Sequence, residues 1–246
     1  MRVAVASVLL LTLVTGAGAQ SPLAAQIRAW AVRYHEDPSS IDRMRVELTR
    51  AVRTDPSVDT LLALAEVCFI WGDVRAKTTD EKLAAYDQGR QAAGRAVELA
   101  PRNAQAHLWY AIDTGRWGQT RGLMRSLSLL PLLRREIDTV LALDPAFPPA
   151  YSLAGHFYYE VPAMVGGDID RAEKLFRTGL KLDPTFTGMR VGLAKVLLKK
   201  GRPAEARKEL EAVLAEKAPA NLADWTMRDS VEAREMLDSV PRQPGG

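Results

Sequence analysis

Hydrophobic residues recur at helical spacing along most of the chain, and four of these patterns end in the same way. The endings read TRAVRTDP, GRAVELAP, DTVLALDP and RTGLKLDP. Their prolines, Pro56, Pro101, Pro145 and Pro184, lie 45, 44 and 39 residues apart. Because proline cannot continue a helix, each one marks the end of one amphipathic helix, and the next helix begins shortly after it. The pattern therefore predicts a repeated arrangement of helices.

Small residues hold fixed places around these prolines. Ten residues after three of them lie Ala111, Gly155 and Ala194, and a second, mostly small, position lies five residues before each proline. Small residues at a fixed phase let two antiparallel helices approach closely. With Ala172-x3-Phe176 before the last proline, the pattern resembles the tetratricopeptide (TPR) repeat over roughly residues 25–217. The resemblance implies an all-α solenoid of antiparallel helical hairpins.

The spacing within the repeats is unequal. In the last repeat, the small residue of the first helix precedes that of the second by 12 residues, from Ala194 to Ala206, as in the standard motif. In the earlier repeats the interval is 17 from Gly155 to Ala172, 22 from Ala111 to Leu133 and 24 from Ala65 to Gly89. We predict that the additional residues form loops between the two helices of a hairpin, all along one edge of the solenoid. EVPAMVGGD would be the shortest loop, and the other two would begin with Trp-Gly, in IWGDVRAK and RWGQTRGL.

The N-terminus carries the features of a secretory signal peptide. Arg2 is followed by an apolar run over 3–14 and by an A-x-A site formed by Ala17 and Ala19. We predict cleavage after residue 19 and therefore an exported, periplasmic protein. An uncleaved anchor helix is the alternative. No cysteine follows the apolar run, so bacterial lipidation is not expected, and after cleavage no span remains.

The rest of the chain is predicted to be one domain over 20–240. A first hairpin begins at Ser21-Pro22, and NLADWTMRDSVEAREMLDSV is expected to close the array as a helix with a polar outer face. Residues 241–246 are expected to be a disordered tail. The composition is that of a soluble protein, with 47% hydrophobic and 26% charged residues. The net charge of +3 is dispersed along the chain, which argues against nucleic-acid binding.

Aromatic residues are concentrated in the first helices of the middle hairpins, which line the concave groove of a TPR array. We expect a ligand or partner site there, because aromatic side chains supply large contact areas. The candidate residues are Trp71, Trp109, Tyr110, Trp117, Phe157, Tyr158, Tyr159 and Glu160. Core packing is the alternative interpretation. Residues 157–159 point about 100° apart on a helix, so we expect at least one of the three to face the groove.

Neither metal-binding nor catalytic patterns stand out. The three histidines have no metal-ligand spacing, and Asp168 is interpreted as a helix N-cap rather than a cation ligand. Cys68 lies in an apolar run without a neighbouring His or Lys and is interpreted as a buried thiol. No cofactor, metal or catalytic residue is predicted.

One segment resembles the T-component (TatT) family: LAGHFYYEVPAMVGGDIDRAEKLFRTGLKLDP. Members of that family are periplasmic TPR proteins associated with TRAP transporters. The resemblance implies docking of a periplasmic substrate-binding protein and a small apolar or organic-acid ligand in the groove. The absence of a lipidation cysteine departs from many relatives.

Three function hypotheses follow. The first is a non-catalytic periplasmic adaptor that binds a partner protein and a small ligand in its groove. The second is a general envelope scaffold that binds peptides without a small ligand, for which Lys77, Arg116 and Arg121 are candidate carboxylate-binding residues. The third is an enzyme whose residues meet only in space. Homo-oligomerisation is compatible with all three.

Overall fold

The computed structural model describes residues 22–239, so the predicted signal peptide and tail lie outside the described residues. Within this range the chain is helical and contains no strand. The longer helices are α1 (Pro22–Ala31), α2 (Ser40–Thr54), α3 (Val58–Val74), α4 (Thr79–Leu99), α5 (Ala104–Arg121), α6 (Leu123–Leu143), α7 (Pro148–Glu160), α8 (Ile169–Leu182), α9 (Thr187–Lys199), α10 (Pro203–Ala215) and α12 (Ser230–Ser239). The short helical segments are η1 (Tyr34–Glu36), η2 (Ala163–Val165), α11 (Leu222–Asp224) and η3 (Trp225–Asp229).

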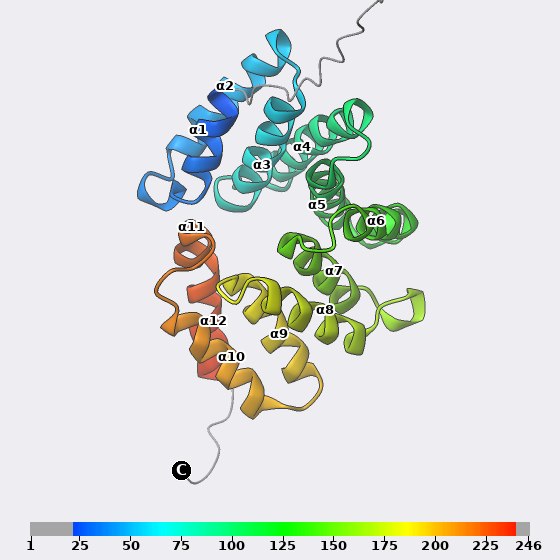
Figure 1. The fold of residues 1–246 in the computed structure, drawn as a ribbon, viewed down its shortest axis with the longest axis vertical. Helices are drawn as coiled ribbons and strands as arrows, with labels where there is room; N and C mark the ends of the chain where they lie inside the picture. Colours follow the sequence, from blue (N-terminus) through cyan, green and yellow to red (C-terminus); the bar gives the residue numbers. More distant parts are fainter. Residues whose placement is uncertain (1–21, 240–246) are drawn as a thin grey trace, which may run out of the picture.

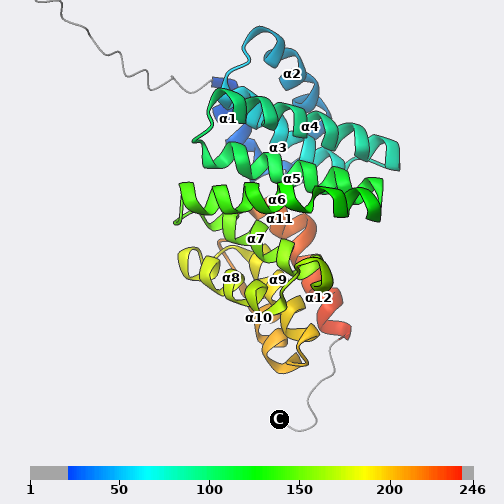
Figure 2. The same ribbon diagram turned by 90° about the vertical axis from the view of Figure 1, so that its right-hand side faces the viewer.

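Consecutive helices form antiparallel hairpins that stack side by side, as the TPR resemblance implies. The inside of the curved array is lined by α3, α5, α7 and α9, and the outside by α4, α6, α8 and α10 (Figure 1). Turned to the side, the hairpins follow one another as layers (Figure 2). The array curves so far that α11 contacts η1 at the other end of the chain. The concave surface therefore faces a closed centre rather than an open trough.

Polar side chains cap several of the helices. Asp168 accepts hydrogen bonds from the amides of Asp170 (3.0 Å) and Arg171 (2.9 Å), which confirms its interpretation as the N-cap of α8. At the start of α4, Thr78 and Glu81 form a capping box. Such caps satisfy amides that a helix leaves without partners in its first turn, and so fix where the helix begins.

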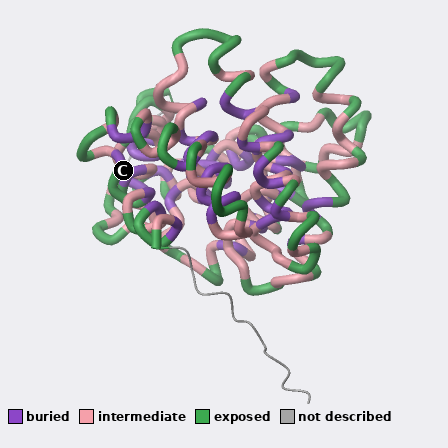
Figure 3. The backbone as a smooth tube through the Cα atoms, turned by 90° about the horizontal axis from the view of Figure 1, so that it is seen from above, coloured by how far each residue is buried: buried purple, intermediate pink, exposed green. Residues whose placement is uncertain are grey.

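The small residues of the repeat lie where helices approach most closely. A Cβ atom built on Gly155 would lie 2.6 Å from the ring of Phe176, and one on Gly179 would lie 2.4 Å from the sulfur of Met189. Ala194 is fully buried. Buried segments gather toward the middle of the molecule and exposed ones lie at the periphery (Figure 3). The predicted helix–helix contacts are therefore confirmed.

The additional residues of the early repeats do not form loops, and that part of the prediction is wrong. They lengthen the helices instead: α4 and α6 have 21 residues each, whereas α10 has 13. Trp71 lies inside α3 and Trp117 inside α5, each followed by a glycine. Of the three predicted loops, the one in the third hairpin is present, over 161–168, whereas four residues join α3 to α4 and one joins α5 to α6.

Glycine explains why the longer helices stay packed. A Cβ atom on Gly72 would lie 2.4 Å from the ring of Tyr86, and one on Gly118 would lie 2.6 Å from Leu129. The second helix of each hairpin can therefore pack along the extension, which satisfies backbone hydrogen bonds and buries side chains. In the third hairpin, Pro162 cannot continue a helix and Gly166 has a φ of 102°, so the chain leaves the helical conformation there.

The last helical segment closes the array as predicted. Residues 222–239 are helical throughout, with a wider turn over η3, and α12 packs against α10. The indole of Trp225 donates a hydrogen bond to the carbonyl of Val213 in α10 (2.7 Å). This segment therefore takes the place that a further hairpin would occupy.

Candidate functional site

The structure distributes the predicted aromatic residues over separate environments. Trp71 lies between α2 and α3, where its indole donates a hydrogen bond to Asp42 (2.6 Å) and the guanidinium of Arg45 lies 4.3 Å from its ring. Trp109 packs against Phe69 with ring centres 5.8 Å apart. Trp71 therefore holds two hairpins together, and the predicted residues do not meet in a single pocket.

Two of the three consecutive aromatic residues belong to the core. Phe157 and Tyr158 are 7% and 4% exposed, and their rings meet edge to face. Tyr159 is half-buried beneath Lys199, whose amine lies 5.1 Å from its ring. The core interpretation that the sequence left open therefore applies to Phe157 and Tyr158, and no ring of the three is fully exposed.

Of the remaining candidates, Tyr110 lies within α5, whereas Trp117 and Glu160 lie near the edge where the hairpins turn. Tyr110 packs over Gly94 of α4. Glu160, at the end of α7, is exposed and accepts a hydrogen bond from Gln119 (2.6 Å). Trp117 is half-buried at the end of α5 and is surrounded by arginines.

A cluster of polar residues that the sequence did not predict as a unit lies on the inner wall. Asp73 of α3 accepts hydrogen bonds from Tyr86 of α4 (2.5 Å), from Arg116 of α5 and from Arg228 of η3 (3.2 Å). We call these four residues the inner cluster. The Asp73 side chain is 9% exposed, so its negative charge is largely removed from water and depends on these donors.

The two arginines of the inner cluster share one aromatic ring. Their guanidinium carbons lie 5.8 Å (Arg116) and 5.7 Å (Arg228) from the centre of the Phe69 ring, within cation–π range. Both side chains remain partly exposed, at 42% and 36%. Within residues 22–239 the buried Nε of Arg116 has no hydrogen-bond partner. Arg228 also forms an ion pair with Asp224 (3.4 Å), so two carboxylates match the two arginines. The inner cluster therefore presents unused donors next to an apolar surface.

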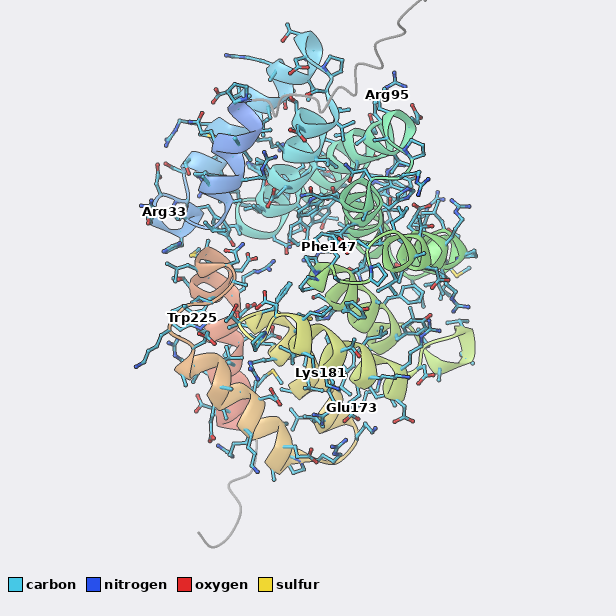
Figure 4. All side chains as sticks on the ribbon, in the orientation of Figure 1. Arg33, Arg95, Phe147, Glu173, Lys181 and Trp225 are labelled. Atoms are coloured by element: carbon cyan, nitrogen blue, oxygen red, sulfur yellow. The ribbon has the colours of Figure 1, made fainter. Side chains whose placement is uncertain are left out.

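Other titratable groups on this wall have shifted pKa values. Burial, and then the positive charges of Lys195, Arg228 and Arg116, lower the pKa of His156 to about 4. Burial raises the pKa of Asp229 to about 6, although the hydroxyl of Thr187 donates a hydrogen bond to it (2.7 Å). Side chains from the surrounding helices project toward the centre of the curved array, and Phe147 is labelled near that centre (Figure 4).

The two ends of the array meet beside the inner cluster. Tyr34 donates a hydrogen bond to Asp224 (2.9 Å), and the amide of Ala223 donates to the carbonyl of Val32 (3.0 Å). We call this contact the closure. Burial, and then the negative charge of Asp224, raise the pKa of Glu66 to about 7. The closure brings Arg228 to Asp73, which is 155 residues away in sequence.

A second acid lies buried behind the inner cluster. Asp113 is 0% exposed, and neither of its carboxyl oxygens has a partner among the described residues. It packs against Gly89, where a Cβ atom would lie 2.5 Å from its oxygen. Burial, and then the charge of Asp73, raise its pKa well above the ordinary value, so the neutral acid is favoured.

The cysteine does not form a pair of nucleophile and base. Cys68 is buried, and burial raises the pKa of its thiol to about 12, which confirms the interpretation of an inert thiol. In the part of the chain that the structure describes, no group of three or more His, Cys, Asp or Glu side chains could hold a metal ion. No helix there is long and apolar enough to cross a bilayer.

Comparison with known proteins identifies the family. The model of the family described as "Regulator of microtubule dynamics protein 1-3" matches residues 30–179, more than half of the chain. The chain belongs to this family. A tetratricopeptide-repeat model matches residues 166–225, so the TPR resemblance is confirmed. The family that matches is not the T-component family, and that resemblance stays a prediction.

Relatives within the family align over part of their length. Regulator of microtubule dynamics protein 2 of Rattus norvegicus is 30% identical over 119 residues, which cover 45% of this chain and 29% of the relative. Protein 3 of Bos taurus is 24% identical over 192 residues, covering 68% of this chain and 40% of the relative. The chain therefore spans less than half the length of the curated relatives that it matches.

A solved structure shows the same fold. The thermophilic TPR protein TTC0263 of Thermus thermophilus superposes with a TM-score of 0.62 at 20% identity, covering 85% of this chain and 95% of that one. At this identity the likeness concerns the fold alone, and it confirms an all-α solenoid of helical hairpins.

Proposed function

We propose that this family member is a non-catalytic adaptor that binds a carboxylate of a partner protein on its inner wall, between Arg116 and Arg228. The observation that carries the proposal is the inner cluster, in which two partly exposed arginines flank one apolar ring and share the carboxylate of Asp73, with Asp224 as a second partner of Arg228. Arginine binds carboxylates with directed, charge-assisted hydrogen bonds. The TPR fold, with its concave surface, supports an interaction role.

The partner carboxylate would accept hydrogen bonds from arginine N–H groups that Asp73 leaves free. Asp73 takes one donor group from Arg228 and one from Arg116, which leaves further N–H groups on both side chains. A carboxylate at the end of a peptide, or on an acidic side chain, would accept these hydrogen bonds. The adjacent side chain of the partner would then pack on Phe69. Because Arg228 reaches the wall only through the closure, binding and closure would stabilise each other.

The test uses peptides with and without a free carboxylate. A random peptide library with free C-termini is selected on the purified protein, and each selected peptide is remade as an acid and as an amide. We expect the acid to bind about tenfold more tightly, and Arg116→Gln to remove most of that difference. Arg53→Gln, which changes an exposed arginine of α2, serves as the control. Equal binding of acid and amide would refute the proposal.

Two further proposals concern the location of the protein in the cell and its ligand. We propose that the protein is exported and that its partner is a periplasmic protein such as a transporter substrate-binding protein; the N-terminal sequence supports this. A small organic acid would present the same carboxylate to Arg116 and Arg228. N-terminal sequencing of the protein from its native host should show Gln20 as the first residue, and recovery of an intact Met1 protein from the cytoplasmic fraction would contradict export. Native mass spectrometry of that material tests for a bound organic acid, and the general peptide scaffold is the alternative if none is found.

Family membership favours a second candidate function. The relatives are named as regulators of microtubule dynamics. For this chain the corresponding proposal is an adaptor that binds a cytoskeletal polymer. Co-sedimentation with polymerised tubulin tests it, with unpolymerised tubulin as control, and a protein that stays in the supernatant would rule it out.

A further inference from the structure

A second charged surface lies where α5 turns into α6. The ring of Trp117 has three guanidinium carbons close to its centre: Arg90 at 4.9 Å, Arg121 at 5.3 Å and Arg125 at 5.5 Å. Of the three, only Arg90 forms an ion pair with a carboxylate among residues 22–239, with Asp87 at 2.5 Å. Three like charges converge here on one ring, although two of them lack a counter-charge. This arrangement favours a negatively charged ligand.

Apolar side chains lie beside these arginines. Leu123 and Met124, the first two residues of α6, are 69% and 79% exposed. Single exposed hydrophobic residues are common on protein surfaces, but here two adjacent ones stand at the tip of a helical hairpin next to unpaired charges. We define the α5–α6 corner as Arg90, Trp117, Arg121, Leu123, Met124 and Arg125.

We propose that the α5–α6 corner binds an acidic peptide segment of a partner protein, with carboxylates on Arg121 and Arg125 and an apolar side chain against Leu123 and Met124. This goes beyond the proposed function, because it is a second surface, formed by residues outside the inner cluster. Charge complementarity supports the choice of occupant. Charged residues at the rim of an interface also speed the encounter with an oppositely charged partner.

The surroundings favour a peptide over an anionic membrane. The first helices of the hairpins run parallel, so their turns share one edge (Figure 2). The neighbouring turns carry three exposed acidic residues against one exposed lysine, Lys77. Asp80 and Glu81 lie exposed at the start of α4, and Glu160 lies exposed at the end of α7. A flat anionic bilayer laid along this edge would meet these carboxylates, whereas a single peptide segment contacts the corner alone.

The test measures binding of short fluorescent peptides to the full chain at about 0.15 M salt, where long-range attraction is screened. The probe consists of Glu-Glu-Leu repeats, and its control has Gln in place of Glu. We expect Arg121→Gln with Arg125→Gln to weaken binding of the acidic probe about tenfold. Leu123→Ser with Met124→Ser should weaken it roughly fivefold.

A matched double variant separates a local site from overall charge. Arg50→Gln with Arg53→Gln removes the same charge from two exposed residues of α2, and we expect binding to change less than about twofold. An equal loss in both double variants, or equal binding of the Gln probe, would overturn the proposal. So would binding to anionic phospholipid vesicles in place of the peptide.

The two surfaces can fail independently. The acidic side chains of the probe also suit the inner wall, so the corner variants are repeated in the Arg116→Gln background. There, Arg121→Gln with Arg125→Gln should still weaken binding of the acidic probe about tenfold, because Arg116 is not part of the corner. Circular dichroism of each variant checks that the helices are intact. No further weakening in that background would assign the probe to the inner wall and would refute the corner.

Discussion

The inner cluster and the α5–α6 corner are built from the same groups, arginine and an aromatic ring, but they differ in how the charges are compensated. In the inner cluster, Asp73 supplies a buried carboxylate for both arginines. At the corner, the guanidiniums of Arg121 and Arg125 face Trp117 and solvent without a carboxylate among the described residues. The comparison separates compensated from uncompensated charge: the first region also holds distant parts of the chain together, whereas the second has two guanidiniums without a carboxylate partner among the described residues.

The largest expected effect is on the inner cluster. Asp73→Ala removes the acceptor of three donors, leaves Arg116 near an apolar ring without its counter-charge, and leaves Arg228 with Asp224 alone. We expect the free energy of unfolding to fall by about 3–5 kcal/mol. Urea denaturation measures it, and Asp87→Ala, which removes the partly exposed partner of Arg90, is the control. A loss as small as that of Asp87→Ala would show that the inner cluster does not stabilise the array.

The helix extension leading to the corner gives the next test. Gly118→Ala places a methyl group 2.6 Å from Leu129 and should lower stability by about 1–3 kcal/mol. Gly115→Ala, one turn earlier in α5, meets Leu133 at an ordinary 3.8 Å and should stabilise by about 0.5–1 kcal/mol. Thermal unfolding compares the two. The same sign in both variants would contradict the close packing of α5 against α6.

The stability of the protein is expected to depend on pH through Glu66, near the closure, and His156. The pKa of Glu66 rises on folding from its ordinary value of 4.5 to about 7, so the folded state binds the proton more tightly and stability falls as pH rises through this range. His156 acts in the opposite sense, because folding lowers its pKa to about 4 and stability rises with pH up to about 6.5.

Glu66→Gln isolates the first contribution. The variant should lose the decline between pH 4.5 and 7 and should be more stable than the original protein at about pH 8, by roughly 1–3 kcal/mol. Urea denaturation across this pH range measures it, with Glu98→Gln, an exposed residue of α4, as control. Parallel stability curves for Glu66→Gln and the original protein would contradict a buried, proton-binding Glu66.

The smallest effect is expected at the corner. Arg121→Gln with Arg125→Gln should change stability by less than about 0.5 kcal/mol, since both side chains are exposed and lack ion pairs within residues 22–239. The same denaturation experiment applies. A loss of several kcal/mol would assign these arginines to folding and would weaken the case for a free binding surface.

Local patterns were sufficient to predict the hairpins but not the form of the inserted residues. The prolines that end helices act locally, and the small residues that contact Phe176 and Met189 recur at a fixed phase of the repeat, so the sequence predicted them well. The longer intervals between the small residues of the two helices suggested loops, and the Trp-Gly pairs were placed at the start of two of them. In the structure Gly72 and Gly118 serve close packing instead, which depends on Tyr86 and Leu129 in the next helix.

The sequence by itself determined the repeat, the N-cap at Asp168, the closing helix and the inert Cys68. Each follows from hydrophobic period, capping chemistry or the absence of a neighbouring base. Only the tertiary structure decided that the array closes on itself and that Arg228 meets Asp73. Curvature accumulates from small rotations between successive hairpins, and no short segment encodes their sum. The residues that form the inner cluster therefore come from α3, α4, α5 and η3, with no spacing that links them in sequence.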